Sequence, residues 1–170
     1  LGDAILTGEP LIGNEAFAVI LADDLCDCDD DGVIKQMINI YKKYKCSVIA
    51  IQEINIKQSN KYGIISGTTI NDNEDLIKVS SLVEKPEINE APSNLAIIGR
   101  YILTPDIFEI LKNIKPDKNG EIQITDALKV QAKQGRVIAY KFKAKRFDCG
   151  SVEGYVKAIN HYANKLNIIN

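Results

Sequence analysis

The sequence is poor in the features that mark membrane, nucleic-acid-binding and zinc proteins. None of its apolar runs approaches the roughly 20 residues that a membrane-spanning helix needs. The net charge is −2, so no overall positive field would attract nucleic acid or anionic lipid. We therefore expect neither a nucleic-acid polymer nor a membrane among the partners.

Histidine and cysteine are also scarce. The four cysteines among 170 residues are irregularly spaced, and a chain of this length buries a core without disulfides. Cys26-x-Cys28 is not a usual zinc spacing, and the single histidine, His161, lies far along the chain. These observations favour reduced thiols in a cytoplasmic protein.

The patterns that are present predict one α/β domain with a mixed sheet. Phe17–Leu21 is an uninterrupted apolar run, typical of a strand buried on both faces. Apolar residues recur at helical spacing over 33–44, and a β-branched run follows at 46–51. These three segments predict a βαβ unit whose helix covers one face of a parallel sheet. Further strands are expected at 62–67, 76–83, 95–103 and 137–142, and further helices at 3–10, 105–112, 125–134 and 150–166.

The first strand ends on two carboxylates, Asp23 and Asp24. Ligands of open α/β sheets bind at the carboxyl ends of strands. Asp23 is therefore a candidate ligand for a hard cation such as Mg²⁺, which favours one or two carboxylates plus substrate phosphates. Alternatively, both acids end the strand and cap the following turn.

Glu84 and Lys85 follow a later strand in the same way. A carboxylate can accept hydrogen bonds from sugar hydroxyls while the ammonium meets a phosphate. Exposed Glu-Lys pairs are also common as purely structural features. Gly63 would allow a ligand to approach the backbone, although the residue taken by itself favours a plain turn glycine.

Gly99 lies inside an expected strand, where glycine marks a bulge or a close approach to the backbone. Asp148 stands just before the last expected helix, beside Gly150. It could complete a carboxylate pair with Asp23 around one Mg²⁺, and it could cap that helix as an alternative or in addition. Cys149 is interpreted as a packing residue because no base partner can be named.

The acidic segment Asp27–Gly32 matches the first six positions of a calcium loop. Ile38 replaces the bidentate glutamate at the twelfth position, and no helix precedes the segment. We therefore expect a solvated acidic loop, with Asp31 capping the following helix.

Together these stretches resemble the bacterial UTP–glucose-1-phosphate uridylyltransferases, or UDP-glucose pyrophosphorylases. The matching segments cover essentially the whole chain, in the family's order. They are Leu1-Gly2-x-Ala4, Ala18–Asp23, Tyr62-Gly63, Val83–Pro86, Ala91–Tyr101 (with SNLAIIGRY), Glu121–Asp126 and Asp148–Gly150.

The resemblance implies a Rossmann-like α/β/α sandwich with a mixed central sheet, in a single nucleotidyltransferase domain over 1–170. It implies uridylyl transfer from UTP to α-D-glucose 1-phosphate, with Mg²⁺, giving UDP-glucose and pyrophosphate. Asp23 and Asp148 match the magnesium ligands, and Asp23 and Lys85 the catalytic residues. Gly2, Gly63, Glu84, Lys85, Asn94 and Gly99 match substrate-binding positions: Gly2 beside the uracil loop, Glu84 at the glucose hydroxyls, Lys85 at the sugar phosphate, and the others around the sugar. The family also implies a homo-oligomer, dimer or tetramer, for the full-length protein.

Two departures stand out. Asp3 occupies a position where many family members have histidine. The chain begins at Leu1 without the family's glycine-rich triphosphate loop, so we expect an N-terminally incomplete domain that is inactive by itself. The alternatives are a non-catalytic sugar-nucleotide-binding module, or a transferase for another sugar 1-phosphate.

Overall fold

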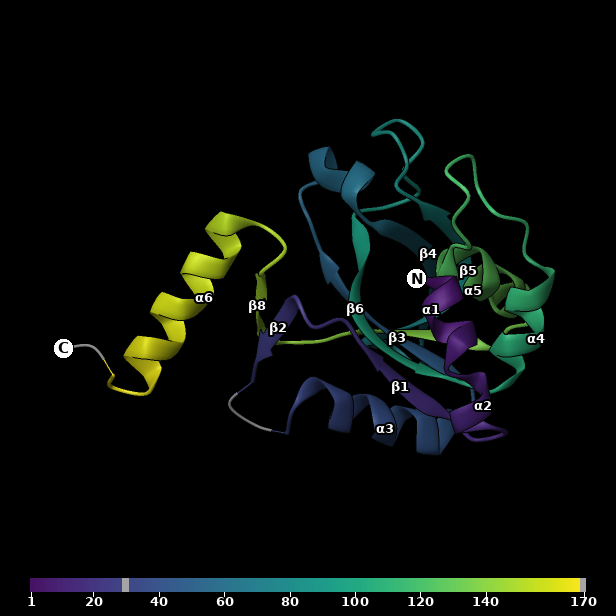
Figure 1. Ribbon diagram of the computed structural model, residues 1–170, viewed down its shortest axis with the longest axis horizontal. Helices are drawn as coiled ribbons and strands as arrows, with labels where there is room; N and C mark the ends of the chain where they lie inside the picture. The colour runs from purple at the N-terminus through teal and green to yellow at the C-terminus, as the bar shows by residue number, and fades with distance from the viewer. Residues whose placement is uncertain (29–30, 169–170) are drawn as a thin grey trace.

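A mixed six-stranded sheet forms the centre of the molecule in the computed structural model, which describes residues 1–28 and 31–168 (Figure 1). In spatial order its strands are β1 (Phe17–Ile20), β6 (Leu95–Leu103), β3 (Ser47–Glu53), β7 (Val137–Lys141), β5 (Asn73–Glu84) and β4 (Gly63–Ile70). The β3–β7 pair is parallel, and the other neighbouring pairs are antiparallel. The predicted mixed sheet is confirmed.

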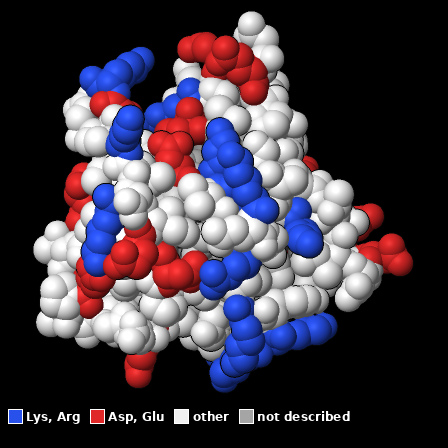
Figure 2. All heavy atoms as spheres, turned by 90° about the vertical axis from the view of Figure 1, so that its right-hand side faces the viewer, with Lys and Arg blue, Asp and Glu red and all other residues white. Residues whose placement is uncertain are grey.

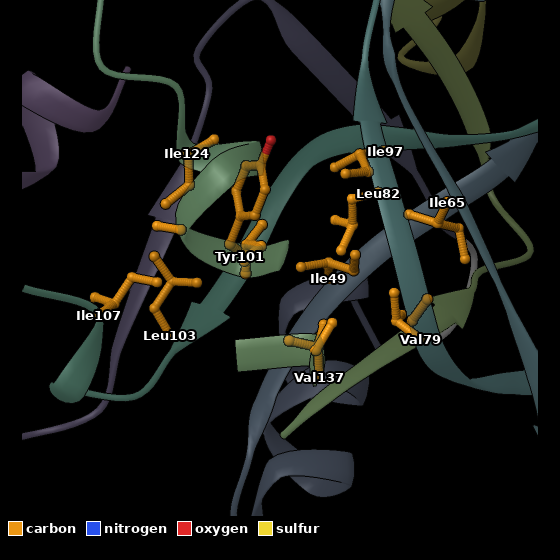
Figure 3. Packing of buried hydrophobic residues seen from close by; sticks show 14 of the residues in the cluster. Ile49, Ile65, Val79, Leu82, Ile97, Tyr101, Leu103, Ile107, Ile124 and Val137 are labelled. Carbon is orange, nitrogen blue, oxygen red and sulfur yellow. The ribbon is translucent and has the colours of Figure 1, made fainter. Parts of the chain in front are cut away.

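Helices cover both faces of this sheet, which confirms the expected α/β/α arrangement (Figure 1). Helix α3 (Val33–Tyr44) packs on one face through Val33 and Met37. The other face carries the larger core, part of which is drawn in Figure 3. It is covered by α1 (Gly2–Thr7), α2 (Glu9–Ile12), α4 (Asp106–Asn113) and α5 (Ile124–Lys133).

Strand β3 has a continuous apolar sequence because it is buried on both sides. Ile49 and Ile51 point to the larger core, Val48 and Ala50 point toward α3, and all four side chains are fully buried. This alternation is what a central strand between two helical layers requires.

The sequence also predicted that the strand at Phe17–Leu21 is buried on both faces, and this prediction was wrong. Strand β1 lies at the edge of the described sheet, and Ile20 is 54% exposed. The opposite side of the strand is covered, where Phe17 stacks on Phe108 with 5.0 Å between ring centroids. An apolar run alone does not reveal whether both faces of a strand are covered.

The predicted βαβ unit is also corrected. Strands β1 and β3 do run parallel, but β6 lies between them and pairs antiparallel with both. Helix α3 therefore connects two strands that do not touch. Chain order predicts which elements follow one another, whereas the inserted strand comes from a segment about 50 residues further on.

A second, two-stranded sheet was not expected from the sequence. Strand β2 (Asp24–Asp27) pairs antiparallel with β8 (Lys145–Asp148), and α6 (Val152–Lys165) packs beside it (Figure 1). The supposed acidic loop therefore begins as a strand, while Asp29 and Asp30 lie outside the described residues. A 3₁₀ helix, η1 (Ile56–Lys61), precedes β4.

The expected cap of α3 differs in the structure, and α4 has no side-chain cap. Gly32, not Asp31, is the N-cap of α3, and Asp31 instead forms an ion pair with Lys35 at 2.6 Å. Pro105 is the N-cap of α4 without a side-chain cap, because the Thr104 hydroxyl bonds within the protein interior. Gly135, with φ +71°, closes α5.

Two further properties concern the surface charges and the apolar character of the helices. Positive and negative side chains are intermixed on the face that carries α1, α4 and α5 (Figure 2). Over 1–28 and 31–168, no helix has both the length and the apolar character to cross a membrane.

Candidate active site

A hollow of about 330 Å³ opens where several strands end. Its wall includes the loop after β1, the start of β4, the ends of β5 and β8, and the segment that leads into α5. The structure brings six of the eight predicted site residues into this wall. They are Asp23, Gly63, Glu84, Lys85, Gly99 and Asp148.

Asp23 and Asp148, 125 positions apart in sequence, meet at Gly150. A Cβ built on Gly150 would lie 3.2 Å from both Asp148 Oδ1 and Asp23 Oδ2, so the two carboxylates converge on a residue that has no side chain. The Cys149 N–H donates to the Asp23 carbonyl oxygen at 2.7 Å and ties the two segments together.

The alternative of Asp148 as a helix cap was wrong. Ser151 is the N-cap of α6, and its hydroxyl accepts from the Gly154 N–H at 3.1 Å. Asp148 Oδ1 instead accepts from the Gly150 N–H at 3.1 Å, in the turn that precedes the helix.

The Asp23–Asp148 donor set fits a hard divalent cation. Mg²⁺ is usually held by one or two carboxylates and keeps several waters or substrate phosphates. No cluster of three or more His, Cys, Asp or Glu side chains suited to a metal exists in the described part of the chain. A cation at this pair would therefore take its remaining ligands from water or substrate.

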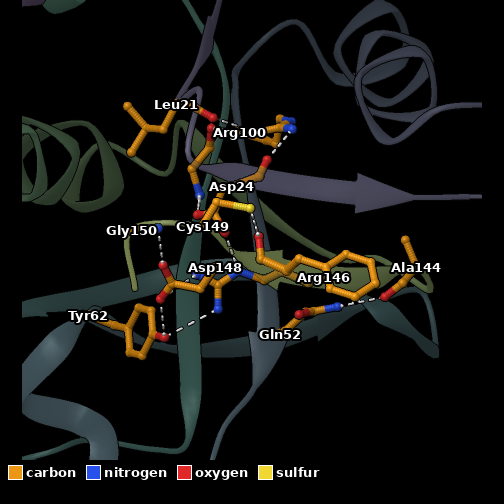
Figure 4. A network of polar contacts seen from close by, with 12 residues as sticks. Leu21, Asp24, Gln52, Tyr62, Arg100, Ala144, Arg146, Asp148, Cys149 and Gly150 are labelled. Atoms are coloured by element: carbon orange, nitrogen blue, oxygen red, sulfur yellow. Dashed lines mark hydrogen bonds and ion pairs between the residues drawn. The ribbon is translucent and has the colours of Figure 1, made fainter. Parts of the chain in front are cut away.

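Asp24 has a specific structural role in the site. From the sequence, it was placed only at the end of the strand. Its side chain is 11% exposed; Oδ1 accepts from Arg146 Nε, and Oδ2 accepts from the Gly99 N–H at 3.1 Å (Figure 4). Arg100 holds the same loop by donating to the carbonyl oxygens of Leu21, at 3.1 Å, and Asp24. These contacts fix the loop that presents Asp23.

Gly99 marks a bulge, as predicted. The register of β3 against β6 passes directly from Ile49–Tyr101 to Ala50–Ile98, so Gly99 and Arg100 have no partner in β3. A Cβ on Gly99 would lie 2.7 Å from the Leu21 Cβ and 2.9 Å from Asp24 Oδ2. The glycine thus allows a close approach by the protein's own loop.

Glu84 and Lys85 lie on the opposite wall of the hollow. Glu84 Oε2 accepts a hydrogen bond from the Thr125 hydroxyl, and Oε1 lies 3.9 Å from Lys85 Nζ. Lys85 has φ +43°, a left-handed conformation that is uncommon outside glycine and concentrates at functional sites. Gly63 opposes Glu84 in the β4–β5 register, and its missing Cβ leaves room beside Glu84 Oε2.

Gly2 and Asn94 do not line the hollow. Gly2 is buried, its N–H donates to the Ile122 carbonyl oxygen at 2.8 Å, and a Cβ there would lie 2.5 Å from that oxygen. Asn94 is exposed, and its carbonyl oxygen accepts from the Ile54 N–H. In this structure the two residues have packing and backbone roles, and their contacts with substrate stay predictions.

Several other side chains that line the hollow were not predicted as site residues, among them Tyr62, Tyr101, Thr125 and Arg146. Burial, together with the charges of Glu84 and Asp24, raises the pKa of the Tyr101 phenol, which therefore stays protonated. Thr125 lies within the matching segment Glu121–Asp126, and Arg146 lies two residues before the matching segment Asp148–Gly150. This proximity was the signal that the sequence offered for them. Nothing local distinguishes them from surface residues.

Three features together indicate the class to which this protein belongs: the acids at the strand ends, the bulged glycine and the α/β/α layers. Residues 1–165 match the family model described as "Nucleotidyl transferase", and the chain belongs to that family.

Several known proteins are similar to this chain in sequence and structure. The chain is 61% identical over 161 residues to a UTP–glucose-1-phosphate uridylyltransferase of Pseudomonas aeruginosa, covering 94% of this chain and 57% of that protein. A crystal structure of UDP-glucose pyrophosphorylase complexed with UDP-glucose matches with a TM-score of 0.92 and 61% identity, over 97% of this chain and 62% of that one. A UTP-bound enzyme from Acinetobacter baumannii matches with a TM-score of 0.81 and 33% identity, over 96% and 56%. The chain thus spans a little over half the length of these relatives.

Proposed function

We propose that the protein containing this chain transfers the uridylyl group of UTP to α-D-glucose 1-phosphate. A phosphate oxygen of the sugar attacks the α-phosphorus of UTP and forms the new P–O bond of UDP-glucose. The bond from the α-phosphorus to the bridging oxygen breaks, and pyrophosphate leaves with that electron pair. The observation that carries the proposal is the convergence of Asp23, Glu84, Lys85 and Asp148 in one hollow, in a chain 61% identical to such a transferase.

The residues of the hollow divide the work by charge. Glu84, oriented by Thr125, would accept hydrogen bonds from glucose hydroxyls, and Gly63 beside it would contact the sugar through its backbone. Lys85, whose side chain is 57% exposed, would meet the sugar phosphate as a point charge. Phosphoryl transfer depends on such positioning and charge stabilisation more than on covalent help.

Nucleotidyl transfer generally uses a divalent metal, and we assign Mg²⁺ to Asp23 and Asp148. When bound, Mg²⁺ would neutralise phosphate charge. The convergence of the two carboxylates on Gly150, which has no side chain, supports this assignment.

We further propose that a glycine-rich triphosphate loop and the first βα unit of the domain belong to a longer polypeptide. The outer face of β1, with Ile20 half exposed, is a surface such a unit would cover. The active protein would be a cytoplasmic homo-oligomer, as the family resemblance implies.

A pyrophosphate-release assay with UTP, glucose 1-phosphate and Mg²⁺ tests the proposal. It should compare the 170-residue chain with the product of the complete open reading frame. We expect turnover by the complete product alone, and its loss on Lys85→Met with retained folding. A folded complete product that releases no pyrophosphate would instead indicate a sugar-nucleotide-binding module. Turnover with another nucleotide or sugar phosphate only would reassign the substrate.

A further inference from the structure

A tyrosine–arginine pair lies beside the carboxylate site. Tyr62 stands between η1 and β4, whereas Arg146 lies in β8, two residues before Asp148. The Arg146 guanidinium carbon is 5.3 Å from the centroid of the Tyr62 ring, and Nη1 donates to the Tyr62 hydroxyl at 3.3 Å.

This contact determines where the tyrosine proton points. Because the Tyr62 hydroxyl accepts from Arg146, its own proton is free to donate to Asp148 Oδ2, at 3.5 Å (Figure 4). Arg146 Nη2 lies 3.7 Å from the same carboxylate oxygen. On the other side of the carboxylate, Oδ1 accepts from the Gly150 N–H. Both oxygens of Asp148 are therefore oriented by protein donors.

Arg146 also reaches the loop that presents Asp23. Its Nε donates to Asp24, whose other oxygen accepts from Gly99, so one guanidinium connects β2, β6, β8 and Tyr62. The Arg146 side chain is only 14% exposed. Arginine keeps its charge in proteins even where it is largely buried.

We propose that Tyr62 and Arg146 are positioning residues that hold Asp148 beside Asp23 in the geometry a divalent cation requires. Two adjacent carboxylates repel one another, and the guanidinium offsets that repulsion while the site is empty. The proposal rests on the proposed function for its biological meaning, but it concerns cation binding by this chain and can be tested separately.

The first experiment measures Mn²⁺ binding to the 170-residue chain by the EPR signal of free Mn²⁺, with and without UDP-glucose. Partners behind metal ligands typically contribute 10- to 100-fold in metal affinity. We expect Tyr62→Phe to weaken Mn²⁺ binding about tenfold, and Asp148→Asn to abolish it. Arg146→Lys keeps the positive charge, but a lysine cannot contact Asp24, Tyr62 and Asp148 together. It should therefore weaken Mn²⁺ binding at least as much as Tyr62→Phe does.

Two matched controls separate positioning from general destabilisation. Tyr140→Phe removes a hydroxyl that donates to Gln36 on the opposite face of the sheet. Arg136→Lys breaks a two-point ion pair with Asp106, also away from the hollow. Both controls should bind Mn²⁺ like the unmodified chain. If Arg146→Lys does not fold, Tyr62→Phe still decides the question.

The outcomes distinguish this inference from the proposed function. Unchanged Mn²⁺ affinity in folded Tyr62→Phe, or no Mn²⁺ binding by the unmodified chain, overturns the positioning roles. In the complete product, Tyr62→Phe should raise the Mg²⁺ concentration for half-maximal pyrophosphate release about tenfold. If that product is inactive yet Mn²⁺ binding depends on Tyr62, the function fails and the positioning role stands.

Discussion

Thr125 donates a hydrogen bond to Glu84 across 41 positions of sequence. The contact joins the first turn of α5 to the end of β5 and fixes one oxygen of the carboxylate that faces the hollow. The other oxygen stays on the side of Lys85. A helix from one layer thus orients a carboxylate at the end of a central-sheet strand.

Replacing Thr125 with valine should weaken UDP-glucose binding about tenfold or more. The change preserves shape but removes the donor to a charged group, a contact that contributes about 1.5–3 kcal/mol. Titration calorimetry would measure the affinity for UDP-glucose. Thr69→Val, at an exposed position on β4, is the matched control and should bind normally. Equal affinities in the two variants would mean that Thr125 does not orient Glu84 for ligand.

Gly99→Ala should destabilise the fold by about 1–3 kcal/mol, as overpacking does in a filled interior. The new methyl group would meet Leu21 and Asp24 at distances that force the loop after β1 to move. Urea unfolding gives the free-energy change. Gly32→Ala, where a Cβ meets nothing within 4 Å, should cost no more than about 1 kcal/mol. A Gly99 variant as stable as the Gly32 variant would show that the loop yields freely.

Ile20→Lys tests the proposed upstream unit. In the 170-residue chain Ile20 is 54% exposed, so the change should alter stability by no more than about 0.5 kcal/mol. In the complete product, a unit packed over β1 would bury the lysine, and we expect a loss of more than about 2 kcal/mol. Ile88→Lys, at a 50% exposed loop position, should be neutral in both. Neutral behaviour of Ile20→Lys in the complete product would argue against a covering unit on β1.

Asp27 should make the attachment of α6 acid-sensitive. Hydrogen bonds from His161 and Lys165, each at 2.6 Å, lower the pKa of Asp27. A lowered folded-state pKa stabilises the attachment above the unfolded value of about 3.9, and the stabilisation is lost as pH falls through the folded value. Hydrogen exchange should therefore show α6 amides losing protection below about pH 3.9.

Two variants make this prediction specific. Asp27→Asn should lower α6 protection at neutral pH and remove its further loss in acid. Asp117→Asn removes another carboxyl of lowered pKa, one that accepts from Gln123 near α5. It should leave the acid response of α6 unchanged. An Asp27→Asn chain whose α6 responds to acid like the unmodified chain would assign that response to other groups.

The elements themselves were largely predictable, because their signals are local. Helical spacing of apolar residues over Val33–Tyr44, β-branched runs such as Ser47–Ile51, and the closing glycine at 135 each depend on a few neighbouring residues. The errors occurred where burial depends on distant partners. Phe17–Leu21 and Val48–Ile51 have similar sequences, yet the first forms a sheet edge and the second is buried on both faces.

The candidate site divides in the same way. Asp23, Glu84 and Asp148 could be selected because acids at strand ends are recognisable in sequence, and the structure places them around one hollow. Arg146 and Thr125 could not be selected from local features. Their importance comes from contacts with Asp24 and Glu84, 122 and 41 positions away.

By itself, the sequence determined the α/β class, most strand and helix positions and the acids that end the strands, since backbone preference and hydrophobic periodicity act over a few residues. Only the tertiary structure decided that β6 lies between β1 and β3, that β2 pairs with β8, and that Tyr62 and Arg146 orient Asp148. These arrangements depend on the burial of whole strands and on hydrogen bonds between segments far apart in the chain. No local pattern specifies such pairings; they are selected together when the chain packs.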